Sequence, residues 1–445
     1  NNLHISQIIN NFATEKGNPI MKEYKARIAD KILSRRLKSV GAVLIQGPKW
    51  CGKTTTAEQQ AQSVVYMDDP ELIAQNIELA KLSPKNLLAG ATPRLIDEWQ
   101  LAPQLWDAAR FEIDHRDGLG QFIFTGSAVP ADTSNIHHTG TGRFSWLTMR
   151  TMSLSESGDS SNEVSLKDLF DHPNLDIFAT NNHNIDDIAW LICRGGWPKA
   201  TIVDKEVALD MAYSYYEAVV NTDISRIDNV HRDAEKAKRI LRSLARNQCT
   251  QIAINTICAD IENNDTTPTN RITVASYIDA LKKIFVLEDS AAWNPNLRSK
   301  TAIRTSDTRY FSDPSIGVAA LGIGPKDLVN DLNTMGLFFE SMCIRDLRVY
   351  ADALNGTVYH YRDGNGLECD AVIHLRDGSY GLIEIKLGGE KNINDGAKNL
   401  LSLASKIDSS KMKSPAFLMV ITGVSKYAIR REDGVYVVPI GCLKE

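Results

Sequence analysis

The sequence has few cysteines and histidines, and they form none of the usual structural or metal-binding patterns. The seven cysteines contain no CxxC pair, and the nine histidines contain no HExxH or similar spacing. This argues against a zinc ribbon, against a disulfide framework and against a histidine-based metal site. A scattered, odd number of cysteines fits a reducing compartment, so we expect a cytoplasmic protein.

Long apolar runs, internal repeats and a strong charge imbalance are also absent. No apolar run reaches the ~18 residues of a membrane span, so we expect no membrane partner. The net charge of −5 argues against a basic nucleic-acid coat but not against a local basic patch. With 445 residues, 43% of them hydrophobic, the chain should fold into about three domains. Residues 1–20 precede the first methionine and have no basic start, and we expect a loosely ordered extension there.

Short apolar runs alternate with helical stretches between residues 21 and 160. The runs are GAVLIQG (41–47), SVVYMDD (63–69), RLIDEWQ (94–100), QFIFTGS (121–127) and FSWLTMR (144–150). Runs that are apolar on both faces and alternate with helices are typical of a parallel sheet covered by helices. We therefore predict an α/β fold with a parallel sheet for this part of the chain.

The segment GPKWCGKT at 47–54 fits the pattern G-x-x-x-x-G-K-[ST] between a strand and a helix. Gly47 and Gly52 would let backbone N–H groups surround phosphate oxygens at the helix N-terminus. Lys53 would reach the β- and γ-phosphates, and Thr54 would place its hydroxyl on Mg²⁺. The expected cofactors are therefore ATP and Mg²⁺. The expected ATP-binding residues are Gly47, Pro48, Lys49, Trp50, Cys51, Gly52, Lys53, Thr54, Thr55 and Thr125.

Two further strands end in residues suited to ATP hydrolysis. Asp97, at the end of one apolar run, would hold Mg²⁺ through water, and Glu98 would polarise the attacking water as general base. Thr125 and Ser127 end the next run, where a polar side chain could sense the γ-phosphate; plain capping of the strand is the alternative.

An arginine that precedes the last strand of this region is a candidate for catalysis in trans. Arg143 could reach the phosphates of a neighbouring subunit, with a local salt bridge as the equal alternative, and Arg150 is a weaker candidate. A trans role for Arg143 implies a homo-oligomer, whose assembly could depend on nucleotide.

The middle of the chain is helical and then changes character. Residues 161–247 are mostly helical, and we interpret them as a lid region. Residues 248–315 show two helices and then a hairpin with a long polar tip, the order of a winged helix. Residues 236–310 carry 12 Lys+Arg against 7 Asp+Glu, a local charge of +5, and LRSKTAIR (297–304) falls on the expected wing. This pattern favours DNA as a partner, and a solvated surface is the alternative.

Together with ICRGGWPKA at 192–200, these motifs give a family resemblance. From about Lys25 to the C-terminus, the chain resembles the predicted AAA+ superfamily ATPases of bacteria and archaea that carry a C-terminal restriction-endonuclease-like domain. The resemblance implies a P-loop ATPase domain at 21–160, a helical and winged-helix middle, and a PD-(D/E)XK nuclease-like α/β domain at 316–445. Trp50 and Cys51 depart from the smaller or basic residues common at these loop positions, without removing an essential group.

The segment GLECDAVIHLRDGSYGLIEIKLGG at 366–389 matches the PD-(D/E)XK pattern. Glu384 and Lys386 are two residues apart on one strand and so point to one face. A hairpin loop of three or five residues would place Asp370 opposite one of them, whereas a two-residue loop would separate them, and we predict the odd loop. Asp370 and Glu384 would bind Mg²⁺ or Mn²⁺, and Lys386 would position the water and stabilise developing charge. Glu340, on the helix at 338–350, takes the usual position of this fold's first acid.

These features favour an ATP-hydrolysing AAA+-type protein that couples its nucleotide state to a DNA-facing, nuclease-like C-terminal domain. One alternative is an ATP-regulated, Mg²⁺-dependent nuclease in defence or repair. The other is a non-catalytic, ATP-driven switch that binds a protein or nucleic-acid partner.

Overall fold

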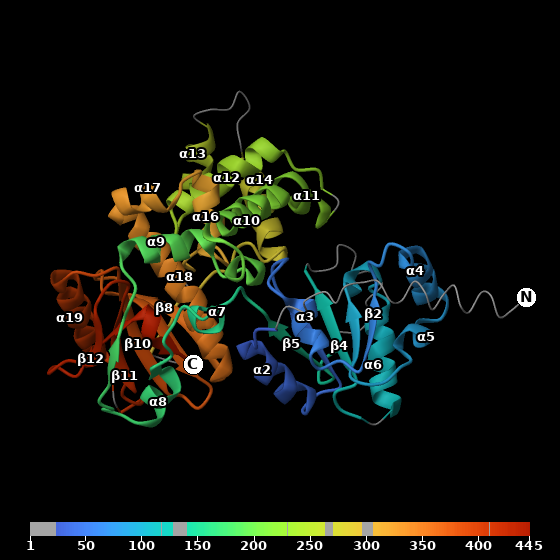
Figure 1. Ribbon diagram of the computed structural model, residues 1–445, viewed down its shortest axis with the longest axis horizontal. Coiled ribbons are helices and arrows are strands. Elements are labelled where there is room, and N and C mark those ends of the chain that lie inside the picture. Colours follow the sequence, from blue (N-terminus) through green and yellow to red (C-terminus); the bar gives the residue numbers. More distant parts are fainter. Residues whose placement is uncertain are drawn as a thin grey trace, which may run out of the picture.

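The computed structural model describes residues 24–116, 118–127, 140–228, 230–262, 270–295, 306–408 and 410–445. The expected extension (1–20) and the basic stretch at 297–304 lie outside these ranges. Across the described ranges, no helix is both long and apolar enough to cross a membrane. Figure 1 shows an N-terminal α/β region, a second α/β region formed mainly by the end of the chain, and a helical region next to them.

The N-terminal region is built on a five-stranded parallel sheet. Its strands are β1 (Ala42–Gln46), β2 (Ser63–Tyr66), β3 (Arg94–Asp97), β4 (Phe122–Gly126) and β5 (Phe144–Thr148), in the order β2-β3-β4-β1-β5. The predicted parallel α/β core is therefore confirmed. Because β4 lies between β1 and β3, the three strands expected to carry nucleotide-binding groups end side by side at one edge of the sheet.

Helices cover both faces of this sheet, which is why its strands are nearly continuous apolar runs. Val43 and Ile45 of β1 belong to the same apolar cluster as the buried residues of α2 (Ile28–Leu37). Ala42 and Leu44 alternate with them and pack in a second cluster with Trp106. The remaining helical elements are α3 (Lys53–Glu58), α4 (Ile73–Leu82), α5 (Pro84–Leu88), η1 (Trp99–Leu101) and α6 (Leu105–Arg116).

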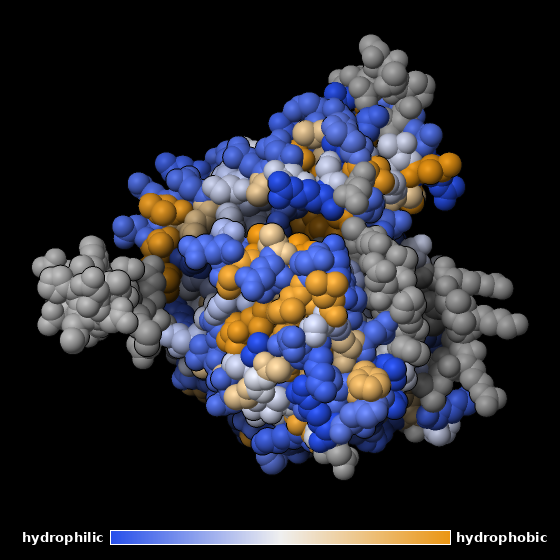
Figure 2. All heavy atoms as spheres, turned by 90° about the vertical axis from the view of Figure 1, so that its right-hand side faces the viewer, coloured by the Kyte–Doolittle hydropathy of each residue, from blue (hydrophilic) through white to orange (hydrophobic). Residues whose placement is uncertain are grey.

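The outer side of this region, toward α4, α5 and α6, exposes apolar side chains. Figure 2 shows apolar side chains gathered within a polar surround on this side of the molecule. The large exposed apolar residues of these elements and their loops are Leu72, Leu82, Leu101, Phe111 and Leu119. Contiguous apolar patches on folded proteins commonly mark interaction surfaces.

The chain leaves β5 and joins the C-terminal region before it forms the helical middle. It passes through α7 (Leu154–Ser157), β6 (Val164–Ser165), α8 (Leu166–Asp171) and β7 (Phe178–Thr180). β6 pairs with β14 (Leu443–Lys444), and β7 pairs with β12 (Tyr427–Arg430) at an edge of the second sheet. Residues 164–180 therefore do not belong to a helical lid starting at 161. Strands of two or three residues are too short to give a periodic sequence signal.

The middle region is a bundle of short helices. They are α9 (Ile185–Arg194), η2 (Pro198–Thr201), α10 (Lys205–Ala218), the π-helical turn η3 (Val219–Asp223), α11 (Ile224–Arg226), α12 (Ala234–Arg246), α13 (Ile254–Glu262), α14 (Arg271–Lys283), α16 (Pro314–Leu321) and α17 (Pro325–Asn330). In α12, buried Ala237, Ile240, Leu241 and Leu244 recur at helical spacing. After α14, isolated antiparallel bridges join Leu287 to Phe311 and Ser290 to Thr308.

Helices α16 and α17 lie in the middle region rather than in the nuclease-like domain expected from residue 316. α16 packs against α9, α10 and α12, and α17 packs against α9. Seven of the eight residues of α16 are buried, so this apolar helix needs neighbours on all sides. The second α/β region begins instead at α18 (Leu332–Ala353).

The second α/β region has a seven-stranded mixed sheet in the order β7-β12-β13-β11-β10-β9-β8. Its other strands are β8 (Gly356–Arg362), β9 (Glu368–Leu375), β10 (Tyr380–Lys386), β11 (Phe417–Thr422) and β13 (Tyr436–Pro439). β8, β9 and β10 form an antiparallel meander, and α19 (Glu390–Lys406) connects β10 to its parallel neighbour β11. The short helix η4 (Ile440–Cys442) leads into β14.

The β9–β10 hairpin has the odd loop that the sequence predicted. Ala371 pairs with Ile383, and the last backbone hydrogen bonds of the hairpin leave residues 376–378 as a three-residue loop. The next pair in this register is Asp370 with Glu384. The hairpin thus brings the two predicted carboxylates to one face of the sheet.

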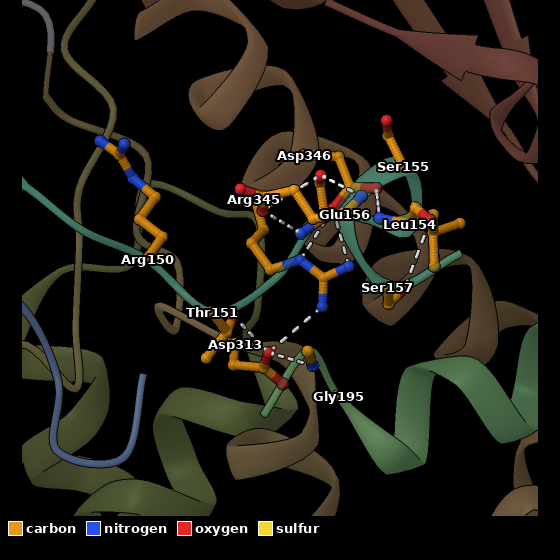
Figure 3. A network of polar contacts seen from close by, with 12 residues as sticks. Arg150, Thr151, Leu154, Ser155, Glu156, Ser157, Gly195, Asp313, Arg345 and Asp346 are labelled. Atoms are coloured by element: carbon orange, nitrogen blue, oxygen red, sulfur yellow. Dashed lines mark hydrogen bonds and ion pairs between the residues drawn. The ribbon is translucent and has the colours of Figure 1, made fainter. Parts of the chain in front are cut away.

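A buried polar network joins the three regions, as Figure 3 shows. Asp313 accepts hydrogen bonds from Thr151 Oγ1 at 2.7 Å and from Arg345 Nη1 at 3.2 Å. Arg345 Nη2 also lies 2.7 Å from Asp346 Oδ1, and Asp346 Oδ2 accepts the Leu154 N–H at 2.9 Å. Because these charges are buried, loss of one partner would leave another uncompensated, and the network holds the regions in one arrangement.

Arg150 forms a second link between regions. Its Nη2 lies 2.6 Å from Glu288 Oε1, and its Nη1 lies 2.6 Å from Asp352 Oδ2. Burial disfavours the charge of Glu288, but Arg150 and Arg348 prevail and lower its pKa to about 2. The Arg150 side chain is only 10% exposed, so it is not placed to reach a neighbouring subunit.

We expect Glu288→Gln to make folding less sensitive to acid. The folded pKa of Glu288 is about 2, below the usual value of a glutamate, so its ion pairs stabilise the fold above about pH 4.5 and lose this effect as the pH falls toward 2. Between pH 6 and pH 3, the wild type should lose about 2 kcal/mol more unfolding free energy than the variant, measured by urea denaturation.

Glu432→Gln is the matched control, because Glu432 is exposed. It should keep the acid dependence of the wild type. Equal pH dependence in all three proteins would contradict a contribution of Glu288.

Candidate functional site

The loop after β1 has the backbone shape of a phosphate-binding loop. A Cβ on Gly47 would lie 2.0 Å from the Met149 carbonyl oxygen, so only glycine fits there. Gly52, with a φ of 98°, precedes the first turn of α3 in the left-handed region. The loop therefore ends on a helix N-terminus, whose free N–H groups and dipole favour an anion.

Lys53 is buried at the mouth of this loop. Its Nζ donates hydrogen bonds to the carbonyl oxygens of Gly47 at 3.1 Å and Pro48 at 2.8 Å. These contacts hold the ammonium group inside the curve of the loop, where phosphates of a bound nucleotide would lie.

Asp97 and two hydroxyl groups meet beside the loop. Thr54 Oγ1 donates to Asp97 Oδ1 at 2.8 Å, and Thr125 Oγ1 donates to the same oxygen from the neighbouring strand. Burial raises the pKa of Asp97, although the hydrogen bonds from Thr125 and Thr54 oppose this shift. Mg²⁺ in nucleotide sites takes one or two carboxylates together with substrate phosphates and water, so the Thr54–Asp97 pair fits this ion.

Glu98 follows in the left-handed region, with a φ of 52°. This sparsely populated conformation for a non-glycine residue turns Glu98 away from the path of β3. Its carboxylate accepts hydrogen bonds from Gln100 Nε2 and from Ser127 Oγ, the latter at 3.4 Å. Burial raises the pKa of Glu98, with Lys53 partly offsetting the shift. A carboxylate with a raised pKa in such a site is suited to general-base chemistry.

The helical middle closes over this site through Tyr215 and Asp223, which the sequence did not single out. Lys49 Nζ lies 2.6 Å from Asp223 Oδ1 in the π-helical turn η3, and the Trp50 ring meets the Tyr215 ring edge-on at 5.9 Å. A cavity of about 300 Å³ lies between the loop, the β3 end and these helices. Its charged and polar lining comes from Lys49, Glu98, Gln100, Ser127, Tyr215, Asp223 and Arg226.

Arg27 supports the loop from behind and was also not predicted. Its Nη1 donates to the Cys51 carbonyl oxygen at 2.9 Å, and its Nη2 donates to that of Arg150 at 3.0 Å. Its Nε pairs with Glu156 Oε1 at 3.0 Å, and both side chains are almost fully buried. No motif around Arg27 signals this role, because its partners lie far away in sequence.

Arg143 lies at the opposite edge of the sheet from the loop. β5 runs parallel to β1 with Phe144 beside Ala42, so Arg143 is about 16 Å from the end of β1 along the strand direction. Its Nε pairs with Asp114 Oδ1 at 2.8 Å, and its side chain is 46% exposed. Arg143 therefore does not serve the nucleotide site of its own chain.

The predicted C-terminal residues also come together. Lys386 Nζ lies 3.2 Å from Asp370 Oδ2 and 2.5 Å from Glu384 Oε2. Asp370 Oδ2 also accepts the Ile385 N–H at 2.7 Å. Glu384 Oε1 is buried without a hydrogen-bond partner. The lysine ammonium thus lies between two carboxylates, one of which keeps a free buried oxygen.

Glu340 reaches the same cluster from α18. Its Oε1 accepts a hydrogen bond from Tyr310 at 2.9 Å, and with Asp370 it lines a cavity of about 140 Å³. Burial and then Asp370 raise the pKa of Glu340 well above its usual value. Burial and Asp370 also raise the pKa of Glu384 to about 8, although Lys386 opposes the shift. Within the described ranges, no three His, Cys, Asp or Glu side chains are grouped closely enough to hold a metal ion by themselves.

Three sequence families match successive parts of the chain. An AAA domain family matches residues 39–158, which contain the loop, Asp97, Glu98 and Thr125. Two families described as domains of unknown function, DUF8612 and DUF4143, match residues 185–327 and 335–443. No curated protein matches the sequence. The family match and the site geometry together support a P-loop nucleotide-binding region of the AAA+ type at residues 39–158.

Solved structures similar to this chain share little sequence identity with it. A Walker-type ATPase of Pyrococcus abyssi is 15% identical, with a TM-score of 0.42 over 67% of this chain and 97% of that one. AMPPCP-bound DnaA from Aquifex aeolicus is 13% identical, with a TM-score of 0.28 over 59% and 89%. The ORC1 protein of Aeropyrum pernix in complex with DNA is 11% identical, with a TM-score of 0.24 over 70% and 97%. At such TM-scores, these likenesses carry no argument about function.

We expect Thr54→Val to raise the Mg²⁺ requirement of ATP hydrolysis. The variant loses the hydroxyl that contacts Asp97, a hydrogen bond worth about 1–2 kcal/mol, so the half-saturating Mg²⁺ concentration should rise about tenfold. Titration of Mg²⁺ at fixed ATP measures this change.

Thr55→Val is the matched control, because Thr55 is the exposed neighbour on the same helix. It should keep the wild-type Mg²⁺ requirement even where it changes the KM for ATP. An unchanged Mg²⁺ requirement in Thr54→Val would show that this hydroxyl does not serve the ion.

Proposed function

We propose that this protein hydrolyses ATP and uses the nucleotide state to control its C-terminal region, which faces DNA. The single observation that carries the first part is the convergence of Lys53, Thr54, Asp97, Glu98 and Thr125 at one edge of the parallel sheet. Lys53 and Thr54 begin α3, after the loop that follows β1. The other three lie at the ends of the adjacent strands β3 and β4. Together they supply the cation, hydroxyl, carboxylate and base that hydrolysis requires.

The chain's own residues divide the work of hydrolysis. Lys53 and the loop N–H groups would bind the β- and γ-phosphates, and Thr54 and Asp97 would hold Mg²⁺. When bound, Mg²⁺ neutralises phosphate charge. Glu98 would orient a water molecule and accept its proton as the water oxygen bonds to the γ-phosphorus and the bond to the β–γ bridging oxygen breaks. Lys49 and Arg226 are further cations that line the cavity beside the loop.

We propose that the ATPase acts as a homo-oligomer in which Arg143 serves the site of a neighbouring subunit. The support is geometric: Arg143 is half-exposed at the sheet edge away from its own loop, and Asp114 holds it there. The exposed apolar side chains near α4, α5 and α6 offer a surface for such a contact (Figure 2).

We propose a PD-(D/E)XK nuclease-like fold for the C-terminal region and a winged helix for the part of the middle region before it. The succession α18, β8, β9, β10, α19, β11 supports the first. The winged helix is supported by the helices α12, α13 and α14, which are followed by the antiparallel segments that contain Leu287 and Phe311. Arg309 in the second of these segments also forms an antiparallel bridge to Thr250, between α12 and α13. The local excess of Lys and Arg at residues 236–310 favours DNA as the partner.

One observation favours an active, ATP-regulated nuclease and another favours a switch. The free buried oxygen of Glu384 could ligate Mg²⁺ or Mn²⁺ together with Asp370, with Glu340 in support, which favours the nuclease. The Lys386 ammonium, however, already contacts both carboxylates, which favours a partner-binding module without cleavage.

Lys53→Ala should abolish ATP turnover, lowering the rate at least a hundredfold, because the other lysine of the loop, Lys49, pairs with Asp223 instead. Phosphate release measures the effect. Lys81→Ala removes an exposed lysine on α4 and should hydrolyse ATP at the wild-type rate. Wild-type turnover in Lys53→Ala would refute the nucleotide site.

Lys386→Ala should abolish DNA cleavage if the C-terminal region is a nuclease, because it removes the charge that would stabilise the phosphorane. The assay uses plasmid and single-stranded DNA with Mg²⁺ or Mn²⁺, with and without ATP, and Lys398→Ala on α19 as the exposed control. Loss of cleavage in Lys53→Ala as well would show control by ATP. No cleavage by a wild type that still hydrolyses ATP would refute the nuclease and support the switch.

A further inference from the structure

A groove separate from both sites runs between the two α/β regions. Its volume is about 810 Å³, and it lies between the end of α2, the edge strand β5 and the β9–β10 loop. Arg35, Arg36 and Trp146 line the N-terminal wall, and Asn355, Arg376 and Asp377 line the C-terminal wall. We call it the arginine groove. Its two walls come from the ATPase region and from the C-terminal region.

The arginine groove has an excess of positive charge. Within the described ranges, the guanidinium groups of Arg35 and Arg376 form no ion pair, and Arg36 Nη1 donates only to the Trp146 carbonyl oxygen. The one acidic lining residue, Asp377, accepts hydrogen bonds from the Ser379 N–H and hydroxyl groups. Burial lowers the pKa of Arg36, and the charges of Arg35 and Arg376 add to this shift while Asp352 opposes it. Three like charges at one groove favour an anionic ligand.

The arginine groove also presents an aromatic surface. Trp146 is 45% exposed, although it lies on a strand, and its ring packs on one side against Trp106 at 5.9 Å. β5 is an edge strand of its sheet, so its outward side has no neighbouring strand. An exposed indole beside unpaired guanidinium groups matches the combination that binds single-stranded nucleic acids, in which bases stack and phosphates pair with cations.

We propose that the arginine groove binds a segment of single-stranded nucleic acid, with phosphates at Arg35, Arg36 and Arg376 and a base stacked on Trp146. This inference rests on the proposed function, and it specifies single-stranded nucleic acid as the partner. Because each wall belongs to a different region, a strand in the groove would contact the ATPase and the C-terminal region at once. An acidic peptide would use the same cations but would gain little from the exposed indole.

The test is fluorescence anisotropy of a labelled oligothymidylate with the full chain over a series of salt concentrations. Arg35→Gln and Arg376→Gln should each weaken binding about three- to tenfold and each reduce the magnitude of the salt slope by about 0.7, the loss of one phosphate contact. Trp146→Ala should weaken binding about tenfold without changing the salt slope, and Trp146→Tyr should restore most of the affinity because it keeps a ring for stacking. Lys81→Gln, on α4 away from the groove, should bind as the wild type does.

The outcomes separate the groove from the wider proposal. If the wild type binds and none of the groove variants weakens binding, the arginine groove is not the binding site, and the proposed DNA-facing function is unaffected. No binding of single or double strands by the wild type would overturn both. A polyglutamate peptide that competes as well as an oligonucleotide of equal charge, with Trp146→Ala unchanged, would overturn nucleic acid as the occupant.

Discussion

The buried guanidinium of Arg27 is the contact on which the arrangement of the molecule depends. It holds the carbonyl oxygen of Cys51 in the phosphate-binding loop, the carbonyl oxygen of Arg150 beyond β5, and the carboxylate of Glu156 in α7. Both charged side chains are almost fully withdrawn from water. Loss of one partner would leave the other as an uncompensated buried charge, at a cost of about 3–5 kcal/mol. The loop is therefore fastened to the segment that leads out of the ATPase region.

From that segment, polar contacts continue into both other regions. Next to Arg27's partner Glu156, the Leu154 N–H binds Asp346 of α18, and Thr151 binds Asp313 at the start of α16. On its other side, the loop meets the helical middle through Lys49 and Asp223. π-Helical turns such as the one that carries Asp223 are frequent at functional sites. A change in the loop's shape would thus alter contacts on two sides of the loop, one toward the helical middle and one toward the C-terminal region. This is the physical basis on which nucleotide state could control the C-terminal region.

The parts that could be predicted from the sequence are those with local signals. The loop motif, the acidic strand end at Asp97 and the strands of the parallel sheet are each indicated by a short stretch of sequence. The odd hairpin loop follows in the same way, because alternation along a strand fixes which residues share a face. The domain that ends the chain could be placed only roughly, because α16 is apolar throughout and shows no face that indicates its neighbours.

The residues that could not be predicted are those whose partners are distant in sequence. Arg27 and Asp223 have ordinary surroundings in the sequence, and only the folded chain brings them to Cys51 and Lys49 of the loop. The same reason explains why β6 and β7 were not predicted from the sequence. Each is too short for a periodic pattern and owes its existence to a strand near the other end of the chain.

The nucleotide site and the C-terminal acidic cluster differ in how their carboxylates are stabilised. At the ATPase site, one oxygen of Asp97 already holds two hydroxyls, so the carboxylate is oriented before any ion arrives, and the phosphates would bring most of the opposing charge. At the C-terminal cluster, Glu340, Asp370 and Glu384 face a single lysine, and burial raises the pKa of Glu340 and Glu384.

A divalent cation at the C-terminal cluster would compete with Lys386 for these carboxylates. Lys386 has three N–H donors, and two of them point to Asp370 and Glu384. One donor remains for a water molecule or a phosphate oxygen. Cleavage would require the ammonium to release at least one carboxylate to the metal, whereas a binding module could keep both. Whether the Lys386 ammonium stays on both carboxylates therefore distinguishes the binding switch from the nuclease.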